Sequence, residues 1–253
     1  MSEYILYIES VCKSFGGLLA VNGLDLAIPK GSVSSVIGPN GAGKTTLFNM
    51  ITGYVMPDSG VITFNEISTK GLKPHQIASL GIARTFQNIQ IFPGMSVLEN
   101  VMAGRHLKSK SGFFLSSFFP PVLRGEERKI KENAEKWLEF TGLTSEACNN
   151  AGSLPLGSQR LLELARALAM EPDLILLDEP ASGLNTRETF RMGSMIEKIK
   201  AMGTTVMLVE HDMELVMEIS DFVAVVNFGT RIAWGTPAEV QRNPDVIRAY
   251  LGE

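Results

Sequence analysis

The sequence predicts an α/β fold with a mainly parallel central sheet, an N-terminal antiparallel β part and a helical insertion. Apolar runs at 174–177 and 205–209 are each followed by acidic or polar residues. Such continuous apolar runs are typical of strands that are buried on both faces of a parallel sheet. A β-branched run at 33–37 leads through a glycine-rich turn into a helical pattern, so strand and helix alternate. Between about 88 and 160 this alternation gives way to amphipathic helical patterns.

The first part of the chain is expected to be mostly strand. Alternation predicts strands at 4–9 and 24–28, and the residues from Ser14 to Val21, with Phe15 among them, are expected to form a loop. Farther on, the patterns predict a strand at 61–64, a short helix at 74–80 and a strand at 82–86 that ends at Gln87.

The helical part and the return to α/β structure follow from caps and periodicity. Ser96 and Glu99 have capping-box spacing, as have Asn185 with Glu188 and Thr236 with Glu239. The remaining patterns predict helices at 124–141 and 159–170, two paired strands at 222–226 and 231–234, and a last helix after Asn243-Pro244. We expect one domain, residues 1–253, with an α/β core at about 1–87 and 161–253 and a helical subdomain at about 88–160.

Composition excludes several classes of protein. The 253 residues carry a net charge of −4 without a block of basic residues, which argues against nucleic acid as the main partner. The two cysteines suggest a reducing compartment, and the N-terminus lacks the features of a signal peptide. The most apolar stretch, around Phe113–Phe119, is far shorter than the roughly 18 residues of a spanning helix. It is expected either to face a membrane partner or to fold over the local core.

The glycine-rich turn fits the pattern G-x-x-x-x-G-K-[ST] between a strand and a helix. Glycines let backbone N–H groups approach phosphate oxygens, and the helix that follows directs its positive end at the same anion. Lys44 is expected to neutralise the β- and γ-phosphates, and the Thr45 hydroxyl to hold Mg²⁺. The residues expected to bind the nucleotide here are Gly38, Pro39, Asn40, Gly41, Ala42, Gly43, Lys44, Thr45 and Thr46.

Three other strand ends carry polar groups, and parallel strands bind ligands at their carboxyl ends. Asp178 is placed to hold Mg²⁺, and Glu179 to accept a proton from an attacking water. Gln87 could orient that water or complete the metal shell, or be an unremarkable strand-end residue. His211 could contact the γ-phosphate, or simply begin a helix beside Asp212.

Together these spacings resemble an ATP-binding cassette (ABC) ATPase over nearly the whole chain. From the residues alone, Phe15 could stack on an adenine ring or cover the edge of the core. The resemblance implies that Phe15 stacks on adenine, that Glu179, His211 and Gln87 are catalytic, and that Asp178 and Gln87 bind Mg²⁺ with Thr45. In that family the helical insertion carries a signature that completes the ATP site of a partner subunit, which here implies Gly157 and Ser158.

Shorter motifs look like those of branched-chain amino acid importer ATPases; urea, amide and lipid transport ATPases are similar. The motifs are Phe15-Gly16-Gly17-Leu18, Arg84-Thr85-Phe86-Gln87, Ser96–Val101, Gly235–Glu239 and the C-terminal segment from Asn243. The resemblance implies ATP and Mg²⁺ as cofactors and a second ATPase subunit, identical or related. It also implies permease subunits that hold the chain at the cytoplasmic face of the membrane, a separate substrate-binding protein and no nucleic acid partner.

One departure from the family concerns the signature. The usual L-S-G-G-Q is replaced by Leu154-Pro155-Leu156-Gly157-Ser158, so the hydroxyl that would reach the partner's γ-phosphate is missing at Pro155. Losing one hydrogen bond to a charged group would weaken a closed dimer by about 1.5–3 kcal/mol per site. The sequence thus predicts a working ATPase that is slow or depends on its partner.

Two other classes compete with the transport ATPase. A soluble ABC protein acting on chromosomes or ribosomes would carry a long coiled coil or a second cassette, and the sequence has neither. A GTPase would carry an N-K-x-D motif, which is absent, and a small-molecule kinase would leave the signature helix unexplained.

Overall fold

The structure is a computed structural model, and it describes residues 3–105 and 120–251. Contacts divide the chain into two compact units, each considered by itself below. Residues Met1–Arg84 and Asp173–Glu253 form the sheet unit, and Thr85–Pro172 form the helical unit. The expected boundaries were 88 and 160, so the helical unit extends twelve residues farther along the chain at its C-terminal end.

The N-terminal strands of the sheet unit form an antiparallel sheet in the order β2-β1-β4-β5. Its strands are β1 (Tyr4–Phe15), β2 (Leu18–Pro29), β4 (Ser59–Phe64) and β5 (Ile67–Ser68). The loop expected from Ser14 to Val21 is wrong, because β1 and β2 continue into a hairpin that turns at Gly16-Gly17, where φ is +53° and +88°. Repeated register shifts between these strands break the two-residue alternation, which hid their full length from sequence analysis.

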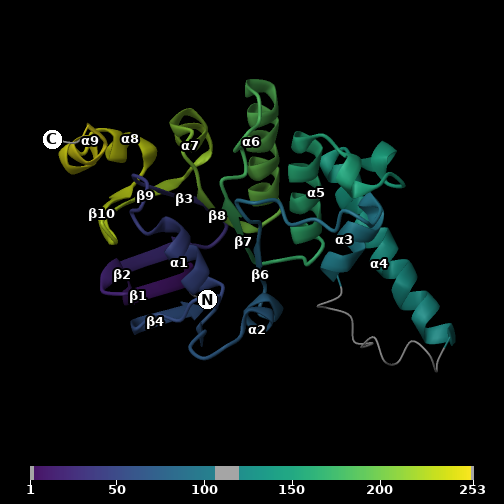
Figure 1. Cartoon of the computed structure of the whole chain (residues 1–253), viewed down its shortest axis with the longest axis horizontal. Helices are drawn as coiled ribbons and strands as arrows, with labels where there is room; N and C mark the ends of the chain where they lie inside the picture. Colours follow the sequence, from purple (N-terminus) through teal and green to yellow (C-terminus); the bar gives the residue numbers. More distant parts are fainter. Residues whose placement is uncertain (1–2, 106–119, 252–253) are drawn as a thin grey trace. The chain divides into compact units, whose positions relative to one another are not determined.

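A second sheet has six strands in the order β10-β9-β3-β8-β7-β6 (Figure 1). All neighbours in it are parallel except the edge pair of β9 and β10, so the mainly parallel sheet is confirmed. Every residue of β3, β7 and β8 is buried, as the continuous apolar runs predict. The strands are β3 (Val33–Ile37), β6 (Ile82–Arg84), β7 (Leu174–Asp178), β8 (Thr205–Val209), β9 (Phe222–Asn227) and β10 (Thr230–Gly235).

The helices of the sheet unit begin at recognisable caps. The capping box at Asn185 is confirmed, since the Asn185 and Glu188 side chains each accept from the other residue's backbone N–H. At Thr236 the Glu239 carboxylate accepts from the Thr236 backbone N–H at 2.7 Å and from its hydroxyl at 2.8 Å. The helices are α1 (Lys44–Ile51), α2 (Pro74–Ser79), α6 (Thr186–Ala201), α7 (Met213–Ile219), α8 (Pro237–Gln241) and α9 (Pro244–Leu251).

The helical unit contains α3 (Val97–Arg105), α4 (Pro120–Thr141) and α5 (Leu156–Leu168). The box before α3 is confirmed, because the Glu99 carboxylate accepts from the Ser96 backbone N–H at 2.7 Å while the Ser96 hydroxyl accepts from the Glu99 N–H at 3.2 Å. The segment Phe113–Phe119 lies outside the described residues.

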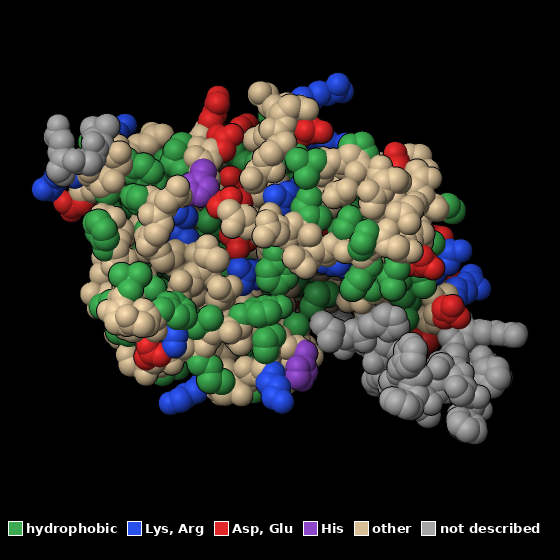
Figure 2. All heavy atoms as spheres, in the orientation of Figure 1, with side chains coloured by type: hydrophobic (Ala, Val, Ile, Leu, Met, Phe, Trp, Pro, Cys, Tyr) green, Lys and Arg blue, Asp and Glu red, His purple; other side chains and the backbone are tan. Residues whose placement is uncertain are grey.

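Surface composition agrees with the scattered charge of the sequence. On the face drawn in Figure 2, the described lysines and arginines are spread among acidic and apolar side chains and do not gather into one broad area. Within residues 3–105 and 120–251, no helix has both the length and the apolar composition needed to cross a bilayer.

Candidate functional site

The phosphate loop connects β3 to α1 and is closely enclosed by backbone from two other strands. Gly38 has φ +152° and Gly43 has φ +104°. A Cβ at position 38 would overlap the carbonyl oxygen of Val226, and one at position 43 would overlap that of Ala20. Only glycine fits both positions, so the loop can bring its backbone N–H groups close to an anion at the start of α1.

Lys44 is the first residue of α1, and its side chain lies across the loop. The ammonium donates hydrogen bonds to the carbonyl oxygens of Gly38 and Pro39 at 2.7 and 3.0 Å. Burial lowers the pKa of Lys44, while the nearby charges of Glu179 and Asp178 raise it. Phosphate oxygens could replace these carbonyl acceptors and would supply the negative charge that a buried ammonium favours.

The expected metal ligands beside Lys44 are oxygen donors. Thr45 is exposed at the start of α1, and Asp178 ends β7 in a buried position. A hydroxyl and a carboxylate suit Mg²⁺, which prefers oxygen ligands and completes its shell with water and substrate phosphate. The donor set therefore fits the ion.

Asp178 is held by a buried ion pair that sequence analysis missed. Arg84 Nη2 donates to Asp178 Oδ2 at 2.7 Å, and both side chains are at most 5% exposed. The other guanidinium nitrogen, Nη1, donates to Asn49 Oδ1 at 2.8 Å and to Thr52 Oγ1 at 3.1 Å. One arginine from β6 thus ties the end of β7 to the helix that follows the phosphate loop.

Glu179 and His211 lie together, as their predicted shared role requires. His211 Nε2 is 3.0 Å from Glu179 Oε1, and since an ionised carboxylate can only accept, the imidazole is the donor. Glu179 follows β7 with φ +51°, a left-handed conformation that is uncommon outside glycine. Its backbone N–H donates to the Val209 carbonyl at 2.9 Å, which joins the ends of β7 and β8.

Glu210 is a second residue that sequence analysis did not identify. It directly follows β8 and is 3% exposed. Burial raises the pKa of its carboxyl group, hydrogen bonds from the backbone N–H groups of Ala181, His211 and Asp212 lower it, and the charge of Glu179 raises it. A charged residue directly after an apolar strand was the available signal.

Gln87 belongs to the helical unit, where α5 fixes its backbone. The strand expected to reach position 86 ends at Arg84, so the strand prediction is two residues too long. Arg160 donates to the carbonyl oxygens of Phe86 and Gln87 at 3.1 and 2.9 Å. Glu163 Oε1 accepts from the backbone N–H groups of Phe86 and Gln90 at 3.3 and 3.2 Å, while the Gln87 residue itself is exposed.

The remaining expected site residues lie at the ends of elements. Phe15 ends β1 and is 48% exposed, with the Lys13 ammonium 5.5 Å from its ring centroid. Gly157 and Ser158 lie in the first turn of α5, which begins at Leu156 rather than at the expected residue 159. Pro155 is the N-cap and makes no side-chain capping bond, in keeping with the altered signature.

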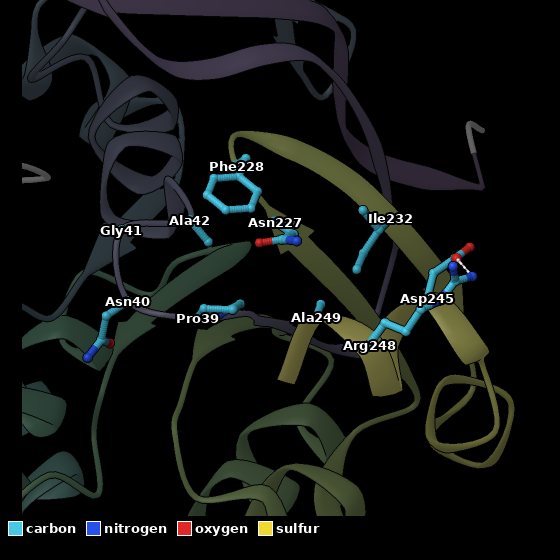
Figure 3. A pocket seen from close by; sticks show the side chains of 10 residues that line it. All are labelled: Pro39, Asn40, Gly41, Ala42, Asn227, Phe228, Ile232, Asp245, Arg248 and Ala249. Atoms are coloured by element: carbon cyan, nitrogen blue, oxygen red, sulfur yellow. Dashed lines mark hydrogen bonds and ion pairs between the residues drawn. The ribbon is translucent and has the colours of Figure 1, made fainter. Parts of the chain in front are cut away.

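A pocket of about 700 Å³ borders the phosphate loop on the side of the β9–β10 hairpin (Figure 3). Residues 39–42 line it together with Phe228 and Ile232 of the hairpin region and with α9. In α9 the Arg248 guanidinium pairs with Asp245 at 2.6 Å, and Figure 3 shows this pair at one end of the pocket.

The phosphate loop has no room for a side chain at Gly38, so a substitution there should destabilise the fold. Gly38→Ala should lower the free energy of unfolding by about 2–4 kcal/mol, from overpacking against Val226 and from the positive φ. Gly41→Ala is the matched control, because φ is also positive (+79°) but nothing lies within 4 Å of an added Cβ. Urea unfolding of both variants checks this, and equal losses would contradict it.

Comparison with known proteins agrees with this geometry. The family described as ABC transporter matches residues 21–182. The chain is 45% identical to the high-affinity branched-chain amino acid transport ATP-binding protein LivG of Salmonella typhimurium, over the full length of both. The chain belongs to the ABC transporter ATPases. Its identity to BraF of Pseudomonas aeruginosa, which has the same described function, is 46%, again over both whole chains.

Solved ABC cassettes share the fold. The ADP conformation of the cassette MJ1267 superposes with a TM-score of 0.86 at 34% identity and full coverage of both chains. A dimeric cassette, MJ0796 bound to ADP and Pi, superposes with a TM-score of 0.79, covering 92% of this chain and 99% of its own, at 23% identity. Like other ABC ATPases, this chain binds ATP and hydrolyses it to drive transport as the ATP-binding subunit of a transporter complex.

Proposed function

We propose that the chain is the motor subunit of an importer for branched-chain amino acids. The observation that carries the substrate assignment is the C-terminal match, over residues 230–253, to the family described as branched-chain amino acid ATP-binding cassette transporter. The full-length similarity to LivG and BraF supports it. The permease and a separate binding protein would recognise the amino acid, while this chain would supply the energy from the cytoplasmic face of the membrane.

The geometry supports specific roles for the residues around the phosphate loop. Lys44 would exchange its two carbonyl acceptors for the β- and γ-phosphate oxygens, and Thr45 and Asp178 would hold Mg²⁺. When bound, Mg²⁺ would neutralise charge that develops on the phosphates. Phe15, half exposed on its hairpin, would stack on the adenine ring.

Hydrolysis would depend on the pair after β7 and β8. Glu179 would accept a proton from the attacking water, and His211, hydrogen-bonded to Glu179 at 3.0 Å, would orient that carboxylate and contact the γ-phosphate. Gln87 would help to place the water and the metal. A second ATPase subunit, identical or related, would contribute its Gly157 and Ser158 region, so that the dimer closes around two nucleotides.

A reconstitution experiment tests the substrate class. The permease and binding protein that co-purify with the chain are incorporated into proteoliposomes, and ATP hydrolysis is measured with added leucine, isoleucine or valine. Several-fold stimulation by these amino acids is expected, with none by urea, short amides or lipid. Stimulation by one of the latter alone would overturn the assignment, and stimulation by DNA or ribosomes would contradict the transport role. Lys44→Met, which removes the ammonium at the phosphates, is the inactive control.

A further inference from the structure

Glu210 directly follows β8, and its side chain reaches the segments after both strands that carry the hydrolytic pair. Its Oε1 accepts a hydrogen bond from the backbone N–H of Ala181 at 2.7 Å, two residues after Glu179. Its Oε2 accepts from the backbone N–H of His211 at 3.0 Å. The two oxygens of one carboxylate thus hold the segment after β7 and the segment after β8.

The chemistry of this position calls for a carboxylate. A carboxylate offers two oxygens that only accept, which matches donors on both sides, whereas a glutamine would turn its NH₂ group toward one of them. Glu210 is 3% exposed, and this burial, together with the charge of Glu179, raises the pKa of its carboxyl group. Burying an acid close to another acid costs free energy. A carboxylate at this position is therefore favoured only where its two acceptor oxygens are needed to join the two segments.

The backbone conformation of Glu179 also depends on the hydrogen bond between Ala181 and Glu210. Its backbone has φ +51°, a conformation that persists only where the surroundings impose it. The bond from the Glu179 N–H to Val209 fixes one side of the residue, and the Ala181–Glu210 bond fixes the other. The 3.0 Å separation of Glu179 Oε1 and His211 Nε2 therefore rests on two backbone segments joined through Glu210.

Building on the proposed roles of Glu179 and His211, we propose that Glu210 is a positioning residue for ATP hydrolysis that fixes His211 relative to Glu179. Because Glu210 is buried, it would act on its neighbours and not on the nucleotide or the attacking water. Its effect passes through the imidazole, because its two hydrogen bonds set where His211 lies relative to Glu179.

The test is a double-mutant cycle on the full chain, with kcat and KM for ATP measured for Glu210→Gln, His211→Ala and the double variant. Glu210→Gln nearly preserves side-chain size and should lower kcat by about 10- to 100-fold while leaving KM and ATP affinity within about two-fold. The double variant should hydrolyse ATP no more slowly than His211→Ala alone, because residues that act as a unit are not additive.

Three results would overturn the inference: a kcat for Glu210→Gln within two-fold of the unmodified chain, losses that multiply in the double variant, or loss of ATP binding in parallel with activity. Glu210→Asp is included as a second variant, because it keeps both acceptors on a shorter side chain and should recover part of the lost kcat. Activity of the unmodified chain separates this inference from the proposed function. If the unmodified chain fails to hydrolyse ATP, the proposed function fails. If it hydrolyses ATP and Glu210→Gln is equally active, only the positioning role of Glu210 fails.

Discussion

Glu179→Gln should lower ATP hydrolysis by about 10²- to 10⁴-fold, the range that general base catalysis supplies. The amide cannot accept a proton from water at neutral pH, but it retains an oxygen that can accept the hydrogen bond from His211 Nε2. ATP binding should remain close to that of the unmodified chain, because the phosphate loop and Lys44 are unchanged.

Single-turnover hydrolysis and equilibrium binding of labelled ATP measure the two effects separately. The variant should also accumulate an ATP-bound dimer, because the step that reopens it is blocked. Size-exclusion chromatography with and without ATP detects this dimer, and failure to dimerise would count against a site completed by a second subunit. Glu188→Gln, which changes a capping carboxylate on α6, is a charge-matched control expected to keep its activity.

Arg84→Met should lower the free energy of unfolding by about 3–5 kcal/mol, since it leaves the buried Asp178 carboxylate without its partner. Asn49 and Thr52 lose their guanidinium donor in the same variant. The double variant Arg84→Met with Asp178→Asn should recover part of this loss, because the uncompensated charge is gone.

Chemical denaturation measures this effect, with Arg128→Met as the control. Arg128 pairs with Glu132 at 2.8 Å on the surface of α4, where its side chain is 81% exposed. Such a pair contributes about 0.3–0.5 kcal/mol. Similar losses in the two variants would contradict the view that the Arg84 pair is a principal link between β6, β7 and α1.

The sequence was most informative where local chemistry dictates local structure. The phosphate loop, the buried strands β3, β7 and β8, and the capping boxes at Ser96, Asn185 and Thr236 follow from the properties of residues close together in the chain. Prediction failed for the β1–β2 hairpin, whose register shifts disrupt the alternation on which strand prediction depends.

The ion pair and hydrogen bonds that hold the site residues in place could not be predicted from the sequence, because they join residues far apart in the chain. Arg84 and Asp178 are 94 positions apart, and Glu210 lies 29 positions from Ala181. Nothing within a short window indicates that these groups will meet; the parallel sheet brings them together. Charged residues inside apolar runs, such as Glu163 in α5, were the visible signal, but a pattern cannot name their partners.

A crystal structure of Glu179→Gln with Mg-ATP tests the proposed nucleotide site most directly. The β- and γ-phosphates should lie on the backbone N–H groups of residues 41–45, with Lys44 Nζ moved from the Gly38 and Pro39 carbonyls to the phosphates. The metal should be held by Thr45, with Asp178 beside it. A nucleotide bound instead in the pocket between Phe228 and Arg248, with Lys44 still on those carbonyls, would contradict the proposed site at the phosphate loop.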